Sequence, residues 1–181
     1  MRTILIIGAG KSTAYLVKYL LEKSEAEQLQ VILADKNIEF AAKLINQHPN
    51  GKAITFDVFD AKQRAKEIQK ADVVVSMLPA RFHIEVAKDC LNFEKNMITA
   101  SYVSDEMQAL NDAAKAKGLL FLNEMGVDPG IDHMSAMQVI DTIRDKGGKL
   151  MLFESFTGGL IAPESDNNLW NYKFTWNPRN V

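Results

Sequence analysis

The fold is decided by one stretch near the start of the chain, Thr3-Ile4-Leu5-Ile6-Ile7-Gly8-Ala9-Gly10-Lys11-Ser12-Thr13. An apolar, β-branched run that stops at a glycine is typical of a strand buried on both faces of a sheet. In a dinucleotide-binding turn the first glycine permits the tight bend and the second lets the backbone approach a pyrophosphate, while the next helix offers free N–H donors. The stretch therefore predicts that a cofactor is contacted by Gly8, Gly10, Lys11, Ser12 and Thr13, with Thr13 in place of the third glycine.

This turn has two other possible interpretations. Gly10-Lys11-Ser12 ends like the phosphate loop of nucleoside triphosphatases, but that motif needs a glycine five residues earlier, where Leu5 stands inside the strand. The loop is too short to wrap a β-phosphate, which excludes this class. A glycine turn without a ligand remains the simpler alternative.

Apolar runs alternate with helical patterns along the following residues. Strands are expected at residues 3–7, 31–34, 53–56, 73–78, 97–100 and 119–122, and helices at 13–23, 38–45, 60–70, 82–91 and 105–117. Strands that alternate with helices predict a parallel sheet with right-handed crossovers. The sequence thus predicts an α/β, Rossmann-type doubly wound domain over residues 1–130.

The pattern changes after residue 130. A helix over residues 131–146, a stop at Gly147-Gly148 and a strand of a different sheet over 149–157 predict the start of a second, α+β domain for substrate binding and dimerisation. Four aromatic residues crowd into Leu169–Trp176, close to the last residue of the chain. We expect residues 131–181 to be an incomplete domain, whose aromatic end marks a truncation or a surface that a second copy covers in a homodimer.

Composition excludes several classes of protein. Lys and Arg number 21 and Asp and Glu 23, so the net charge of −2 gives no general attraction to nucleic acid or anionic lipid. The single Cys90 excludes an intramolecular disulfide framework and a Cys-rich zinc site, and no metal site is predicted. No apolar run is long enough for a membrane span. We expect a cytoplasmic protein that binds small molecules, with neither nucleic acid nor membrane as a partner.

Polar residues at the ends of the expected strands predict the rest of the cofactor site. Asp35 lies 25 residues after Gly10, where an acidic side chain accepts hydrogen bonds from an adenosine ribose and repels the 2′-phosphate of NADP. Lys36 offsets that repulsion, so the sequence favours NAD over NADP only weakly, and a solvated charge at Asp35 is the alternative. Ligands bind outside the carboxyl ends of parallel strands, which adds Asp57, Ser76, Met77, Leu78 and Thr99 to the expected cofactor contacts.

Two later loops carry groups that can transfer protons. They are residues 99–104 and 123–133, with Tyr102, three acids and His133 at the ends of expected strands. Each has a structural alternative: Asp132 can cap a helix, His133 can be an ordinary hydrogen-bonding residue, and Glu124 can orient the loop.

Four motifs together resemble the saccharopine reductase family, the glutamate-forming saccharopine dehydrogenases. They are Ser101-Tyr102-Val103-Ser104, Asn123–His133, Gly158–Glu164 and Tyr172–Trp176. The resemblance implies an NAD(P)-dependent oxidoreductase acting on a CH–NH bond. It would interconvert saccharopine and water with 2-aminoadipate semialdehyde and glutamate, in lysine metabolism.

The same resemblance implies roles for particular residues. It implies that Tyr102 and Asp128 lie beside the reacting nitrogen as catalytic and substrate-binding groups. It also implies that Ser101 lies near the substrate or the nicotinamide, and that the backbone from Glu124 through Val127 to Asp128 lines the nicotinamide.

Three departures from the family pattern leave alternatives open. Thr157 replaces a cysteine, Ile161 replaces a proline, and Lys36 replaces a phosphate-reading arginine. A related carboxylated imine such as carboxynorspermidine, or a non-catalytic dinucleotide-binding regulatory module, is therefore an alternative function.

Overall fold

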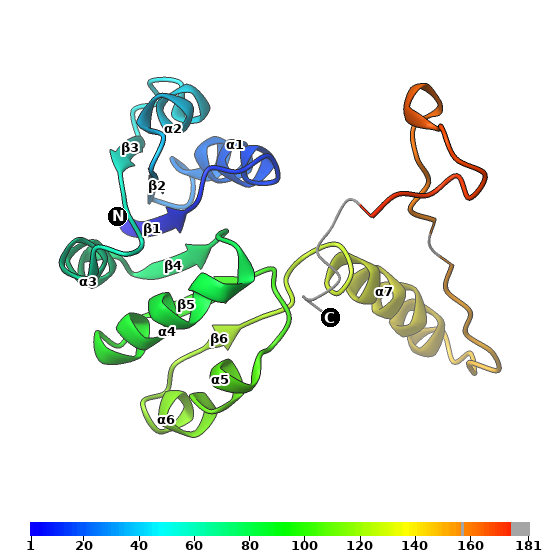
Figure 1. Ribbon diagram of the computed structural model, residues 1–181. Helices are drawn as coiled ribbons and strands as arrows, with labels where there is room; N and C mark the ends of the chain where they lie inside the picture. Colours follow the sequence, from blue (N-terminus) through cyan, green and yellow to red (C-terminus); the bar gives the residue numbers. More distant parts are fainter. Residues whose placement is uncertain (157, 175–181) are drawn as a thin grey trace. The chain divides into compact units, whose positions relative to one another are not determined.

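Six parallel strands form one sheet in the first part of the chain, in the order β3-β2-β1-β4-β5-β6 (Figure 1). Their bounds are β1 (Arg2–Ile7), β2 (Leu29–Asp35), β3 (Gly51–Thr55), β4 (Val73–Ser76), β5 (Asn96–Thr99) and β6 (Phe121–Leu122). The computed structural model describes residues 1–156 and 158–174 and divides the chain into two compact units, Met1–Gly130 and Ile131–Val181. The predicted doubly wound α/β fold is confirmed.

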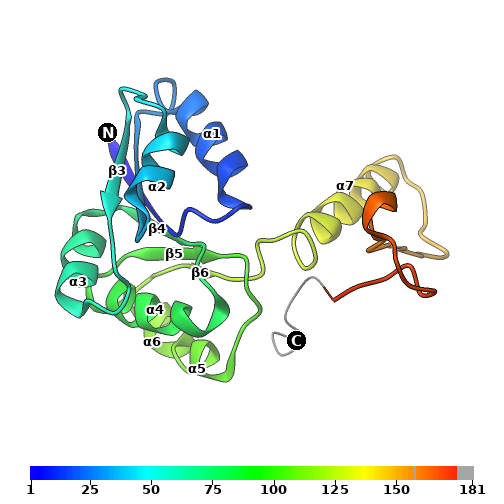
Figure 2. The ribbon, with the colours of Figure 1, turned by 45° about the horizontal axis from the view of Figure 1, so that its top comes forward.

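Helices cover both faces of this sheet, as Figures 1 and 2 show. One face carries α1 (Thr13–Lys23) and α2 (Ile38–Ile45); the other carries α3 (Ala61–Lys70), α4 (His83–Asn92), α5 (Asp105–Gln108) and α6 (Asn111–Ala116). Leu5 and Ile7 of β1 pack into the core beneath α3 and α4, whereas Ile6 packs beneath α1 and α2. The central strand is therefore buried on both faces from Leu5 to Ile7, which is why residues 4–7 are continuously apolar.

The sheet order reverses between β1 and β4. Both neighbours of β1 run parallel to it, β2 on one side and β4 on the other. The connections that follow the two strands at such a point run to opposite sides of the sheet, so a crevice opens beyond the carboxyl ends of these strands. This position is where the fold favours a ligand.

One predicted helix is divided in the structure. The pattern over 105–117 predicted one helix, but α5 ends at Gln108 and α6 begins at Asn111. The N–H of Leu110 donates to the carbonyl of Met107, three residues back instead of four, because Leu110 turns in to pack against the core. Core packing thus outweighs the helical propensity of the segment.

The cysteine lies in the core. Cys90, on the inner face of α4, is fully buried, and burial raises the pKa of its thiol to about 12. It packs there as a small apolar residue.

The second unit contains the helix α7 (Ile131–Asp145) and one turn of 3₁₀-helix, Pro163–Ser165. The helix ends before Gly147, whose φ of +78° suits a glycine. The strand predicted over 149–157 is wrong for residues 149–156, which form no strand because no other segment of the described residues pairs with them. Thr157 and the last residues of the aromatic segment, 175–176, lie outside the described residues. No helix in the described ranges has the length and apolar character needed to cross a bilayer.

Candidate functional site

The turn after β1 requires glycine at its first position. Gly8 has φ of +105°, and a Cβ there would lie 2.8 Å from the carbonyl oxygen of Met77. The buried hydroxyl of Thr13 donates to the Gly8 carbonyl at 3.0 Å. Thr13 thus fixes the turn from inside the helix, which explains why a threonine is tolerated in place of the third glycine of the fingerprint.

The start of α1 is open to an anion. Ser12 precedes the helix without capping it by a side-chain hydrogen bond, and the first turn carries no acidic residue. Gly10, Lys11 and Ser12 are exposed. The free N–H groups and the positive end of the helix dipole therefore face solvent, as a pyrophosphate site requires.

Asp35 connects two loops. Its Oδ2 accepts a hydrogen bond from the Ala9 N–H at 2.7 Å, and its Oδ1 accepts one from the Asn37 N–H at 2.8 Å. Both carboxylate oxygens therefore already have backbone donors. Asp35 joins the glycine turn to the start of α2, where Asn37 in turn caps the helix by accepting from Phe40 at 3.0 Å.

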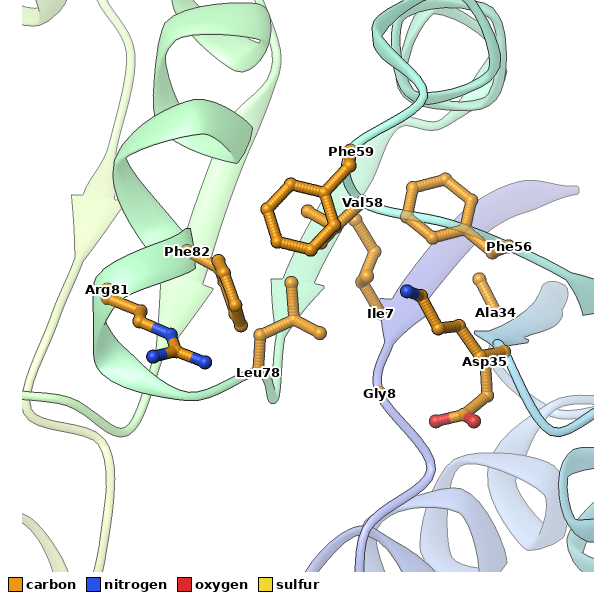
Figure 3. A pocket seen from close by; sticks show the side chains of 11 residues that line it. Ile7, Gly8, Ala34, Asp35, Phe56, Val58, Phe59, Leu78, Arg81 and Phe82 are labelled. Carbon is orange, nitrogen blue, oxygen red and sulfur yellow. The ribbon is translucent and has the colours of Figure 1, made fainter. Parts of the chain in front are cut away.

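A pocket of about 360 Å³ opens beside this turn (Figure 3). It brings together four predicted residues, Gly8, Asp35, Lys36 and Leu78. Seven lining residues were not predicted as contacts. Ile7 and Ala34 lie on strands, and the other five are Phe56, Val58, Phe59, Arg81 and Phe82. These five directly follow the third and fourth strands, so the strand-end rule that selected Asp57 and Leu78 could have found them.

The mouth of the pocket alternates cations with aromatic rings. The Lys36 Nζ lies 5.3 Å from the centre of the Phe59 ring, and the Arg81 guanidinium lies 4.6 Å from that of Phe82. The two rings meet edge to face with centres 5.1 Å apart. Rings and cations so arranged suit a planar base that carries phosphate groups nearby.

Asp57, a predicted cofactor contact, does not line the pocket but pairs with Lys36, which does. Its carboxylate pairs with Lys36 at 3.3 Å. The N–H of Phe59 donates to its Oδ1, and this bond, followed by Lys36, holds the pKa of the Asp57 carboxyl below its ordinary value. Asp57 is therefore an anion that orients both Lys36 and the backbone of Phe59.

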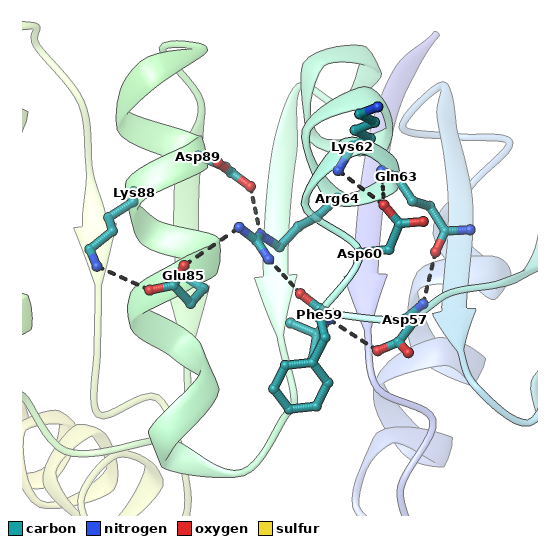
Figure 4. A network of polar contacts seen from close by, with 10 residues as sticks. Asp57, Phe59, Asp60, Lys62, Gln63, Arg64, Glu85, Lys88 and Asp89 are labelled. Atoms are coloured by element: carbon teal, nitrogen blue, oxygen red, sulfur yellow. Dashed lines mark hydrogen bonds and ion pairs between the residues drawn. The ribbon is translucent and has the colours of Figure 1, made fainter.

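A buried arginine supports the loop that carries Phe59 (Figure 4). The Arg64 Nε lies 2.6 Å from Asp89 Oδ2 on α4, and its guanidinium also contacts Glu85 and donates to the Val58 carbonyl. Asp89 neutralises the buried charge, which would otherwise be costly. One guanidinium thus joins α3, α4 and the loop that lines the pocket.

A second polar group lies at the ends of β4 and β5, where Ser76, Thr99 and Ser101 surround the imidazole of His83. His83 is 4% exposed, and desolvation lowers its pKa to about 4, so the imidazole is neutral at pH 7. The sequence analysis did not select His83 as a site residue, although Phe82-His83 also fits the pattern of the family that the sequence resembles.

The remaining predicted residues lie on the loops after β4, β5 and β6. Glu124, at φ of +62°, donates its N–H to the Ser101 carbonyl and accepts the Val103 N–H on its side chain. Tyr102, Val127 and Asp128 are exposed, and no hydrogen bond joins Tyr102 to Asp128 in the part of the chain that the structure describes. Met77 extends the β4 pairing through its N–H to Ile7 at 2.8 Å.

Comparison with protein families matches both units of the chain. Residues 4–122 match the family described as saccharopine dehydrogenase NADP binding domain, and residues 126–181 match saccharopine dehydrogenase C-terminal domain. The first match covers the sheet and its pocket.

Curated relatives and a solved structure carry the same names. Saccharopine dehydrogenase (NADP(+), L-glutamate-forming) of Schizosaccharomyces pombe is 38% identical over 181 residues, which are 100% of this chain and 40% of the relative. Alpha-aminoadipic semialdehyde synthase of Arabidopsis thaliana is 41% identical over 157 residues, 87% of this chain and 15% of the relative. The structure of apo saccharopine dehydrogenase (L-Glu forming) from Saccharomyces cerevisiae superposes with a TM-score of 0.78 at 34% identity, covering 97% of this chain and 39% of that one. This chain therefore spans 40% or less of the length of these relatives.

Proposed function

Because the chain belongs to the saccharopine dehydrogenase family, we propose that it supplies the dinucleotide site of an oxidoreductase acting on a CH–NH bond. The reaction is the oxidation of saccharopine by NADP⁺ with addition of water, giving glutamate, 2-aminoadipate semialdehyde, NADPH and a proton. The bound nicotinamide supplies the hydride acceptor. The residues of this chain hold the cofactor and orient the substrate.

One observation carries the proposal: the open start of α1 follows the glycine turn and lies beside the pocket that Gly8 lines. A Cβ at Gly8 would meet the Met77 carbonyl, whereas one at Gly10 would meet no atom within 4 Å. Space for a bulky anion thus exists on the Gly10 side of the turn. The pyrophosphate would bind the N–H groups there, and the adenosine would enter the pocket.

We propose NADP, not NAD, as the preferred cofactor. The NAD preference inferred from Asp35 has no support from the comparisons, whose matched domain and fungal relative are named for NADP. In the structure the Asp35 carboxylate is engaged by two backbone amides, while Lys36 and Arg81 line the pocket. A 2′-phosphate in contact with Lys36 would replace its ion pair with Asp57.

At the reacting end, Tyr102 and Asp128 are proposed as the catalytic groups. Both are exposed on loops at the carboxyl side of the sheet, where a substrate can reach them. A phenol and a carboxylate can exchange protons with the amine nitrogen and with water. The division of residues 1–130 for the cofactor and 131–181 for substrate and dimerisation, the homodimer and the cytoplasmic location remain predictions.

The proposal is tested by calorimetric titration of the chain with NADPH, NADP⁺, NADH and NAD⁺, and by following NADPH formation from saccharopine. We expect NADPH to bind about tenfold to a hundredfold more tightly than NADH, since one charge-assisted contact contributes about 1.5–3 kcal/mol. Binding without turnover in the complete protein would favour the regulatory module. Turnover of carboxynorspermidine in place of saccharopine would favour the related imine, and absence of dinucleotide binding would refute the proposal.

A further inference from the structure

A buried group of side chains connects the ends of β4 and β5 to the ligand crevice. Ser76 and Thr99 are paired residues of these two strands, and both contact His83 at the start of α4. The imidazole Nδ1 lies 2.8 Å from the Ser76 Oγ, and Nε2 lies 2.7 Å from the Ser101 Oγ. Ser76, Thr99 and His83 are buried, whereas Ser101 is half-buried at the start of the loop. Ser101 is therefore the member of this group that a ligand can reach.

The imidazole in this group has one proton to donate. Burial lowers the pKa of His83 to about 4, and its hydrogen-bond partners are hydroxyls, with no carboxylate among them to stabilise an imidazolium. A neutral imidazole has one N–H donor and one acceptor nitrogen. One of the two serines must therefore donate to His83, and the other must accept from it.

The surroundings of Ser76 indicate which serine donates its proton to the imidazole. Within the described residues, the imidazole is the one hydrogen-bond partner of the Ser76 hydroxyl, which is fully buried and out of reach of water. If Ser76 only accepted from Nδ1, its own O–H would be buried without an acceptor. Ser76 therefore donates to Nδ1, so that the proton of the imidazole is on Nε2 and is donated to Ser101.

Thr99 makes longer contacts with the imidazole than either serine does. Its Oγ1 lies 3.2 Å from Nε2 and 3.5 Å from Nδ1, and it accepts the N–H of Ser101 at 3.3 Å. The N–H bond and the lone pair of an imidazole point outward in diverging directions, so a hydroxyl almost equidistant from both nitrogens lies on neither axis. Thr99 packs against the ring and holds the backbone of Ser101.

We propose that His83 is a positioning residue that fixes the Ser101 hydroxyl as a hydrogen-bond donor toward an acceptor oxygen of the bound ligand. With its own oxygen accepting from Nε2, Ser101 has its proton free for the crevice. The inference rests on the proposed function, since it takes the end of β5 to face the reacting part of the ligand. The acceptor oxygen is a carboxylate of the amino-acid substrate or the carboxamide oxygen of the nicotinamide.

The tautomer of His83 is measured first, by nitrogen NMR of the chain labelled with ¹⁵N-histidine, and the signal is assigned with His83→Gln. We expect a protonated Nε2 and an unprotonated Nδ1 at neutral pH, without any added ligand. A protonated Nδ1, or an imidazolium, would overturn the proposal. Because this measurement needs no cofactor, it decides the role of His83 even if the proposed function fails.

The ligand contact is measured by titrating Ser101→Ala with NADPH and, in the presence of NADP⁺, with saccharopine. Ser104→Ala, which removes a cap of α5 from the same loop, is the matched control. We expect Ser101→Ala to weaken the binding of one of the two ligands about tenfold or more. Weaker binding of NADPH would identify the nicotinamide carboxamide as the acceptor, and weaker binding of saccharopine would identify the substrate carboxylate. We also expect His83→Gln, whose amide still donates, to keep most of the affinity that His83→Leu loses. Unchanged affinity of Ser101→Ala for both ligands, where the wild-type chain binds them, would overturn the proposal.

Discussion

The buried imidazole of His83 makes the stability of the first unit depend on pH. Its pKa falls from 6.5 to about 4 on folding. Above pH 6.5 neither state binds a proton there, but between pH 6.5 and 4 the unfolded state binds one and the folded state does not. Stability is therefore complete above pH 6.5 and is lost as the pH falls, at about 1.4 kcal/mol per pH unit. At pH 4.5 the loss from this one group reaches about 2.5 kcal/mol.

The substitution His83→Gln isolates this contribution. At pH 7.5 the variant is expected to be less stable than the wild type by about 1–2 kcal/mol, because a glutamine replaces the buried hydrogen bonds imperfectly. At pH 4.5 the wild type should have lost about 2.5 kcal/mol that the variant keeps, since glutamine does not titrate. The variant should then be as stable as the wild type or more stable. Urea unfolding is followed by circular dichroism, because both tryptophans lie after residue 130 and do not report on the sheet.

The matched control is His48→Gln, at a half-exposed histidine of the same unit. A difference between wild type and His83→Gln that stays constant between pH 7.5 and 4.5 would refute the reasoning. The same shift in the control would also refute it, because the effect would not be specific to the buried ring.

Three further substitutions test the site. Gly8→Ala should destabilise the unit by about 2–3 kcal/mol in thermal unfolding and abolish dinucleotide binding, because the Cβ meets the Met77 carbonyl at a positive φ; normal binding would contradict the turn. Arg64→Met should cost about 2–3 kcal/mol in urea unfolding, since the partly buried Asp89 is left without its partner. Adding Asp89→Leu should recover part of that loss, and a double variant no more stable than the single one would contradict the pairing. Lys36→Ala should weaken NADPH binding about tenfold or more and NADH binding little. Equal weakening of NADPH and NADH binding would show that Lys36 does not contact the 2′-phosphate.

The sheet could be predicted from the sequence because its signal is local. Residues 4–7 and 73–75 are continuous apolar runs, the first of which ends at Gly8, and such runs have few alternatives to a central parallel strand. Asn37 at the start of α2 is equally local, since a cap and its helix are neighbours in the chain.

Features that depend on distant partners could not be predicted. Residues 149–156 have an alternating pattern, but a strand also needs a neighbour, which no single segment reveals. The sequence predicted a ribose contact for Asp35 but not its hydrogen bond to Ala9, because Ala9 lies 26 residues away in the chain. The pocket side chain Phe59 meets Lys36 and Phe82 only once three loops converge.

The burial of Cys90 has a chemical consequence for the chain. With a pKa of about 12, only about one thiol in 10⁵ is ionised at pH 7, and the sulfur is shielded within the core. The position where the resemblance led us to expect a cysteine carries Thr157, so residues 1–181 present no accessible sulfhydryl. Alkylating agents and peroxides can therefore modify Cys90 only when the first unit opens. The rate at which Cys90 is labelled thus measures how often that unit opens.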